Sequence, residues 1–279
     1  MKAQAFFPAS LFSEDLFSQG KEICQKRLGV ELVHETLPVP QAYSAGPLSE
    51  RRDSFLAGLN GPEVEILWAA RGGYGTVEWL GDLPKNTEKW QGKTLIGYSD
   101  LTALHAFTSN LGLRSIHGPM IATKNWCEAT DLEINSLKHA IHGEKQKISC
   151  QFNSNDTIQG RLVGGNLTVL ASLMGTPWQL KLQPGDILFL EDINEAHYAL
   201  ARSLRQLSFS ENFAKVTILW GHLSSCAHSF STEQELLQAL MTPYENLWGC
   251  GIWAGHEQEN LSLPLGLPAK IERNTLFLK

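Results

Sequence analysis

The chain lacks the features that would place it in a membrane, on nucleic acid or in a disulfide-bonded class. No stretch of its 279 residues approaches the roughly 18 consecutive apolar residues of a membrane span. Residues 1–8 are too short and too soon interrupted by proline for a signal peptide. The net charge of −6 gives no electrostatic reason to bind nucleic acid or an anionic membrane. Five scattered cysteines without a C-x-x-C pair indicate reduced thiols. We therefore expect a cytoplasmic protein.

Nucleotide and metal motifs are also missing. There is no G-x-G-x-x-G and no complete G-x-x-x-x-G-K-[ST], so a phosphate-binding loop is weakly supported. His222, Cys226, His228 and Cys250 could be taken for zinc ligands, but structural zinc sites normally show tighter paired spacing. We expect no metal and no cofactor.

The composition is that of a globular protein, with 43% hydrophobic and 19% charged residues. Strand and helix patterns alternate along the chain, which favours an α/β fold. We expect a mainly parallel sheet flanked by helices in an N-terminal domain (1–145), a polar linker (146–160) and a mixed α/β domain (161–279). Hydrophobic periodicity and capping residues place the elements. Helices are expected over residues 13–29, 48–59, 101–111, 166–174 and 196–207, strands over 5–7, 64–70, 94–96, 186–190 and 216–220, and a hairpin through 273–274.

The most informative stretch runs from Thr94 to His105. A short apolar run stops at Gly97, Ser99 follows two residues later, and a helical pattern begins directly after it. A serine on a sharp strand-to-helix turn presents its hydroxyl beside the N–H groups of a helix start, where negative charge is favoured. This predicts an acyl-transfer nucleophile, although a serine in this place could also be a simple helix cap.

Two other strands of the predicted fold also end in chemically useful side chains. Glu191 follows an apolar strand, and His256 follows the run that ends at Gly255. Because ligands collect at the carboxyl ends of strands in α/β sheets, these groups can converge with Ser99. Histidine suits the role of base, and a carboxylate on its other ring nitrogen fixes its tautomer. Asp192 competes with its neighbour as the acid, but strand alternation points the two to opposite sides.

A glycine cluster, Ala70-Arg-Gly-Gly-Tyr-Gly75, follows a predicted buried strand. Glycine lets the backbone approach a ligand closely, and consecutive N–H groups can hold an anion. One interpretation is an oxyanion hole, a second is a phosphate site, and a third is a tight turn.

Taken together, these segments resemble the successive motifs of the LD-carboxypeptidase family of serine peptidases. The resemblance covers about residues 64–266 in the correct order. Two stretches depart from the family pattern, a short opening loop at Phe7-Pro-Ala-Ser10 and Trp220-Gly-His-Leu223. The matching segments are Ala70-Arg-Gly-Gly-Tyr-Gly75, Gly97-Tyr-Ser-Asp100, Thr102-Ala-Leu-His105, His117-Gly-Pro-Met120, Gly164-Gly-Asn-Leu167, Gly175-Thr-Pro-Trp178, Ile187-Leu-Phe-Leu-Glu-Asp-Ile-Asn-Glu195, Gly255-His256 and Asn260-Leu-Ser-Leu-Pro-Leu-Gly266.

The resemblance implies residue roles. Ser99 resembles the family nucleophile, Glu191 its acid and His256 its base. A glutamate in place of aspartate is acceptable, because only a carboxylate within reach of the imidazole is required.

The same resemblance implies an active site in the cleft between the two domains, an oxyanion hole and a substrate. The backbone N–H of Asp100, with that of Gly72 or Gly73, would form the hole. The substrate would be a small muropeptide from which terminal D-alanine is released in cell-wall recycling, and a homodimer is also implied. Arg71, Tyr74 and Asn166 are the predicted substrate-binding residues; Arg161 could bind a carboxylate too, although surface pairing is the usual fate of such arginines.

Two other functions stay open at this point. An immunity-type peptidase would cleave a peptidyl- or acyl-nucleotide antibiotic. A two-domain ligand-binding module or inactive homologue would keep the cleft without catalysis. Glu191 could also merely pair with Arg202 or Arg205 on the following helix.

Overall fold

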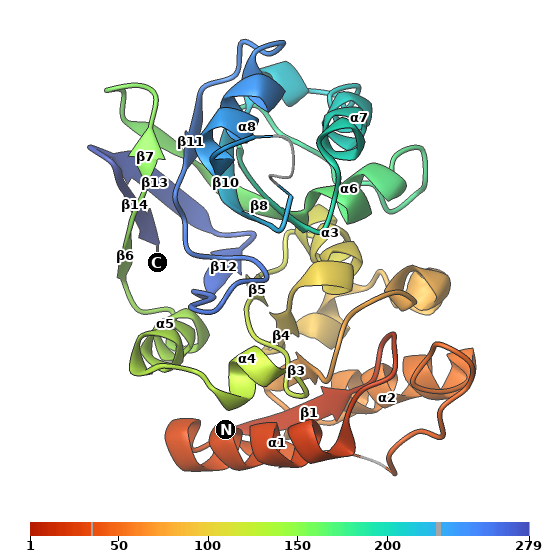
Figure 1. Cartoon of the computed structure of the whole chain (residues 1–279). Coiled ribbons are helices and arrows are strands. Elements are labelled where there is room, and N and C mark those ends of the chain that lie inside the picture. The colour runs from red at the N-terminus through yellow and green to blue at the C-terminus, as the bar shows by residue number, and fades with distance from the viewer. Residues whose placement is uncertain (35, 227–229, 279) are drawn as a thin grey trace.

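Two β-sheets, each flanked by helices, form the protein (Figure 1). The computed structural model describes residues 1–34, 36–226 and 230–278. Within these residues the first sheet has the order β12-β5-β4-β3-β1-β2, and the second has the order β6-β14-β13-β8-β9-β10-β11-β7. This architecture confirms the predicted α/β class.

The first sheet is parallel except at one edge. Strands β1 to β5 pair in parallel, as the predicted strand–helix alternation requires. The last strand, β12, comes from the C-terminal part of the chain and pairs antiparallel with β5. The strands are β1 (Lys2–Phe6), β2 (Glu31–Val33), β3 (Ile66–Ala69), β4 (Thr94–Gly97), β5 (Ser115–His117) and β12 (Leu263–Leu265).

Helices cover both faces of this sheet. The first helix shows how the sequence sets its ends: the Ser13 hydroxyl accepts the N–H of Leu16, and Gly29 ends the helix at φ 65°. The helices here are α1 (Glu14–Leu28), α2 (Leu48–Asn60), α3 (Thr102–Asn110), α4 (Lys124–Cys127) and α5 (Asp131–His142), with the 3₁₀ turns η1 (Thr76–Asp82), η2 (Thr87–Trp90) and η3 (Ser99–Leu101).

The second sheet is mixed. Strands β8 to β11 run parallel, and β13, β14 and β6 extend the sheet antiparallel on one side, as β7 does on the other. Its strands are β6 (Gln146–Ser149), β7 (Gln151–Phe152), β8 (Ile158–Asn166), β9 (Ile187–Ile193), β10 (Thr217–Ser224), β11 (Trp248–Cys250), β13 (Pro268–Glu272) and β14 (Thr275–Leu278). Its helices are α6 (Leu167–Ser172), α7 (His197–Leu207) and α8 (Glu233–Met241), with the turn η4 (Phe213–Lys215).

The two sheets share one apolar core. Leu95 from β4, Leu104 from α3 and Leu190 from β9 belong to the same buried cluster, and α3 contacts both β8 and α6. Residues 146–160, expected as a linker, contain β6, β7 and the start of β8. The domain limits taken from the sequence stay a prediction. In the described ranges, no helix is both long and apolar enough to cross a membrane.

Candidate active site

Ser99 lies on a strained turn between β4 and α3. Its φ is 61°, in the left-handed region that costs a residue with a side chain about 1–2 kcal/mol. The turn also needs Gly97, since a Cβ there would lie 2.7 Å from Leu101 Cγ. Strain of this kind is typical of a nucleophile held at the top of an α/β sheet.

A buried histidine is hydrogen-bonded to the strand end that leads into this turn. His105 Nε2 donates to the carbonyl of Gly97 over 2.9 Å, so its Nδ1 accepts from the Ser115 hydroxyl at 2.8 Å. Burial lowers the pKa of His105 to about 3, and the ring therefore stays neutral. His105 is thus a structural link between α3, β4 and β5.

Glu191 and His256 form a close pair. His256 Nδ1 donates to Glu191 Oε2 over 2.7 Å, which leaves Nε2 as the basic nitrogen of the ring. Glu191 is 0% exposed. Burial by itself would raise the pKa of Glu191, but the charge of His256, with help from His117, outweighs burial and lowers it to about 2. The carboxylate is therefore ionised and can orient the imidazole.

The contact between Glu191 and His256 also changes the pKa of the histidine. Burial by itself would lower the pKa of His256, but the charge of Glu191 and its hydrogen bond outweigh burial and raise it. Asp192 and Glu257 add to the increase.

Asp192, the competing acid, points the other way. Its carboxylate accepts from Asn166 Nδ2 at 2.9 Å and from the Thr168 hydroxyl at 2.7 Å. The expected alternation along β9 is present, and only Glu191 reaches His256.

Ser99 and His256 line one cavity of about 360 Å³. Among the hydrogen bonds of the described residues, none joins the Ser99 hydroxyl to the His256 ring. Catalytic hydrogen bonds are often long before substrate binds. The cavity is lined by Leu16, Arg71, Gly72, Gly73, Tyr98, Ser99, Met120, Ala122, Thr123, Lys124 and His256.

The glycine loop is tied directly to the serine turn. The Asp100 carboxylate accepts from the backbone N–H of Thr76 at 2.9 Å and from its hydroxyl at 2.6 Å. A Cβ on Gly72 would lie 3.4 Å from both Ser99 Cβ and the Asp100 nitrogen, whereas one on Gly73 would meet Ser10 Oγ at 2.2 Å. Of the two glycines, Gly72 is therefore the one whose α-carbon faces the turn that carries Ser99.

The predicted substrate-binding residues lie in different surroundings. Arg71 is exposed and lines the cavity. Tyr74 is 52% exposed and lies beyond the lining, with its ring 5.9 Å from that of Tyr43. Asn166 is 4% exposed, and its side chain caps α6 and donates to Asp192, so the geometry gives it a capping role. Arg161 donates two hydrogen bonds to the buried carboxylate of Asp186, over 3.2 and 2.9 Å, so its guanidinium group already has a partner.

Sequence reasoning missed the residues that hold the His256 loop. Asn125 Nδ2 donates to the carbonyls of His256 and Glu257, and Asn260 Oδ1 accepts the N–H of Gly255 over 3.0 Å. Asn260 belongs to one of the family-like motifs, but Asn125 comes from helix α4, which the sequence does not connect to His256. His117 also belongs to one of the family-like motifs, and its Nε2 lies 3.8 Å from Glu191 Oε1.

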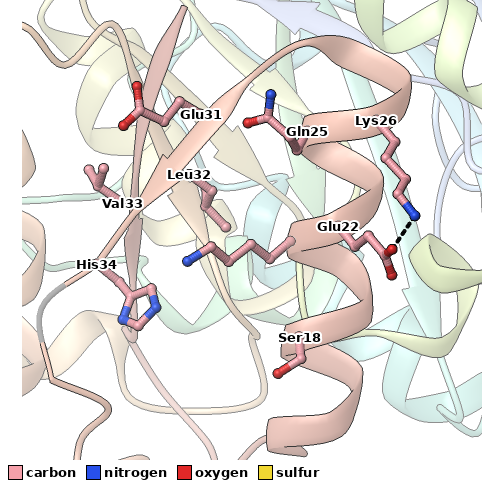
Figure 2. Close-up of a pocket in the computed structure, with 9 residues that line it drawn as sticks. Ser18, Glu22, Gln25, Lys26, Glu31, Leu32, Val33 and His34 are labelled. Atoms are coloured by element: carbon pink, nitrogen blue, oxygen red, sulfur yellow. Dashed lines mark hydrogen bonds and ion pairs between the residues drawn. The ribbon is translucent and has the colours of Figure 1, made fainter.

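A further cavity of about 660 Å³ lies between α1 and β2 (Figure 2). Its polar side chains include Glu22 and Lys26, which form an ion pair with each other. None of the predicted catalytic residues lines it. Within the described ranges, no group of three or more His, Cys, Asp or Glu side chains could hold a metal ion; His228 lies outside those ranges.

The chain belongs to the LD-carboxypeptidase family. The N-terminal domain of that family matches residues 5–118, and its C-terminal domain matches residues 159–271. The solved structure of muramoyltetrapeptide carboxypeptidase from Oxalobacter formigenes superimposes with a TM-score of 0.87 at 26% identity, covering 100% of this chain and 98% of that one. The two-domain α/β fold is therefore that of the family.

Curated relatives carry two kinds of name. A murein tetrapeptide carboxypeptidase of Pseudomonas aeruginosa is 30% identical over 84% of this chain and 81% of its own length. The microcin C7 self-immunity protein MccF of Escherichia coli is 27% identical over 95% of this chain and 88% of its own length. A putative carboxypeptidase of Rickettsia prowazekii is 38% identical, but the match spans 52% of this chain and 48% of that protein.

Proposed function

We propose that this protein is a serine-type LD-carboxypeptidase that releases the terminal D-alanine of a murein tetrapeptide. The observation that carries the proposal is the 2.7 Å pair of His256 and Glu191 at the cavity that also contains Ser99 on its strained turn. The relatives named for murein peptides support the choice of substrate.

In the proposed reaction, Ser99 Oγ attacks the peptide carbonyl while His256 Nε2 takes the hydroxyl proton. Glu191 stabilises the imidazolium ion that forms. The N–H of Asp100, with that of Gly72 or Gly73, holds the oxyanion. As the tetrahedral intermediate collapses, His256 gives its proton to the leaving D-alanine nitrogen. Water, activated by the same histidine, then hydrolyses the acyl-enzyme.

A carboxypeptidase must also receive the free carboxylate of its substrate. Arg71 at the cavity wall provides a guanidinium group, whose planar donors match a carboxylate. Lys124, which also lines the cavity, adds a second cation. We assign these two side chains to the carboxylate end of the peptide.

The enzyme would work in the cytoplasm on recycled muropeptides, as a homodimer. A sedimentation measurement of the purified chain tests the dimer.

One observation favours a second candidate, an immunity-type peptidase. MccF, a protein with that kind of name, is 27% identical over 95% of this chain. The exposed ring pair of Tyr43 and Tyr74 offers a surface on which a base could stack.

Hydrolysis of two substrates separates the candidates. We expect D-alanine release from murein tetrapeptide with a kcat/KM far above that for cleavage of aspartyl sulfamoyl adenosine. The reverse order would replace the murein assignment by the immunity assignment. Cleavage of neither would contradict both.

The pH dependence of kcat/KM should report His256. Because its neutral form is the base and its pKa is raised, we expect activity to fall as pH drops below a midpoint above the ordinary histidine value. The decrease should approach about tenfold per pH unit. A rate that is flat between about pH 5 and pH 8 would contradict histidine as the base.

A further inference from the structure

His117 is a buried histidine that the proposed reaction does not yet use. It ends β5, is 0% exposed and is surrounded by rings. Its ring centroid lies 5.0 Å from Phe189, 5.8 Å from Tyr98 and 6.4 Å from His105. Among the described residues, neither of its ring nitrogens has a hydrogen-bond partner.

The nearest charged group to His117 is also incompletely paired. Glu191 Oε2 accepts from His256, but Oε1 has no hydrogen-bond partner among the described residues. His117 Nε2 lies 3.8 Å from Oε1. Buried polar atoms without partners are destabilising, and an apolar side chain would fill this place more stably. Three such atoms lie together here, the two ring nitrogens of His117 and Oε1 of the predicted acid itself. Their retention points to a role in function.

We propose that His117 is a positioning residue for Glu191, an inference that rests on the proposed function. With its proton on Nε2, the ring directs an N–H at Oε1 while Oε2 holds His256. At 3.8 Å the contact is electrostatic, and a shortening of about 1 Å when substrate fills the cleft makes it a hydrogen bond.

The position of His117 suits this role. β5 belongs to the first sheet, and His117 pairs in register with Gly97, two residues before Ser99. Glu191 lies on β9 of the second sheet. The contact therefore joins the strand beside the nucleophile to the strand that carries the acid, and it keeps the carboxylate aligned when the two sheets adjust to a substrate.

Loss of His117 should change the titration of the pair. Glu191 faces His256, His117 and the hydroxyl-bearing ring of Tyr98, and its chain neighbour is Asp192. Without the N–H on Oε1, the carboxylate charge is balanced by His256 alone. The protonated form of His256 is then favoured, so the acid limb of kcat/KM moves to higher pH.

The test compares His117→Leu and His117→Gln with wild type. We expect His117→Leu to keep or raise the melting temperature, because it removes two unpartnered nitrogens. Its kcat should fall about 10- to 100-fold with little change in KM, and its acid limb should move up. His117→Gln keeps an N–H donor and should recover part of kcat. His139→Leu, on the outer side of α5, is a matched control with wild-type kinetics.

Two further variants separate this inference from the proposed function on which it rests. In a Glu191→Gln background, His117→Leu should cause no further loss of kcat. A wild-type kcat and pH profile in His117→Leu would overturn the positioning role, and so would an equal loss of kcat with and without Glu191. If Ser99→Ala and Glu191→Gln both keep wild-type activity, the proposed function itself fails.

Discussion

Ser99→Ala should abolish D-alanine release, with a loss of kcat on the order of 10⁴- to 10⁶-fold. The alanine has no oxygen to attack the carbonyl, while the cavity and the Glu191–His256 pair stay in place. Substrate binding should therefore persist, measured by calorimetry with the tetrapeptide. Ser18→Ala on the exposed face of α1 should have wild-type kinetics.

The strain at this position gives a second readout. Because φ is 61°, Ser99→Gly should be equally inactive but more stable to thermal unfolding than Ser99→Ala, by about 1 kcal/mol. Substantial activity in Ser99→Ala would remove the nucleophile from the account. Equal stability of the two variants would contradict the strained turn.

Glu191→Gln should reduce kcat by about 10⁴-fold. Glutamine is nearly the same shape, but its amide neither fixes the Nδ1–H tautomer of His256 nor stabilises the imidazolium ion. With the carboxylate gone, burial lowers the pKa of His256, so the remaining activity should have its acid limb at lower pH than wild type.

Asp192→Asn provides the comparison from the adjacent position. Its side chain faces Asn166 and Thr168 and not the histidine, so its effect on kcat should be far smaller. If Asp192→Asn and Glu191→Gln lose equal activity, the assignment of the acid is contradicted.

Local patterns predicted most of the elements. The Ser13 cap and Gly29 stop of α1 depend on neighbours a few residues away, so the sequence contains them. The pairing of β12 with β5, and of β6 and β7 with opposite sides of the second sheet, joins segments far apart in the chain. Periodicity does not carry such long-range pairing, and this is why residues 146–160 look like a linker in the sequence.

In the candidate site, too, local patterns could be predicted from the sequence and long-range contacts could not. Their positions at strand ends and their complementary chemistry made Ser99, Glu191 and His256 candidates from the sequence. In the structure, His256 Nδ1 lies 2.7 Å from Glu191 Oε2. Asn166, predicted as a substrate-binding residue, has its side chain at the start of α6, where it accepts the N–H of Val169. The roles of Asn125 and His117 depend on contacts between distant segments, which the sequence does not display.

Covalent labelling of the serine tests the central claim most directly. A fluorophosphonate is attacked at phosphorus by an activated serine oxygen, and fluoride leaves. Intact-mass measurement should show one adduct per wild-type chain, located on the peptide that contains Ser99, with parallel loss of D-alanine release. A chain that releases D-alanine from tetrapeptide while the adduct forms at another residue, with Ser99 unmodified, would contradict the account.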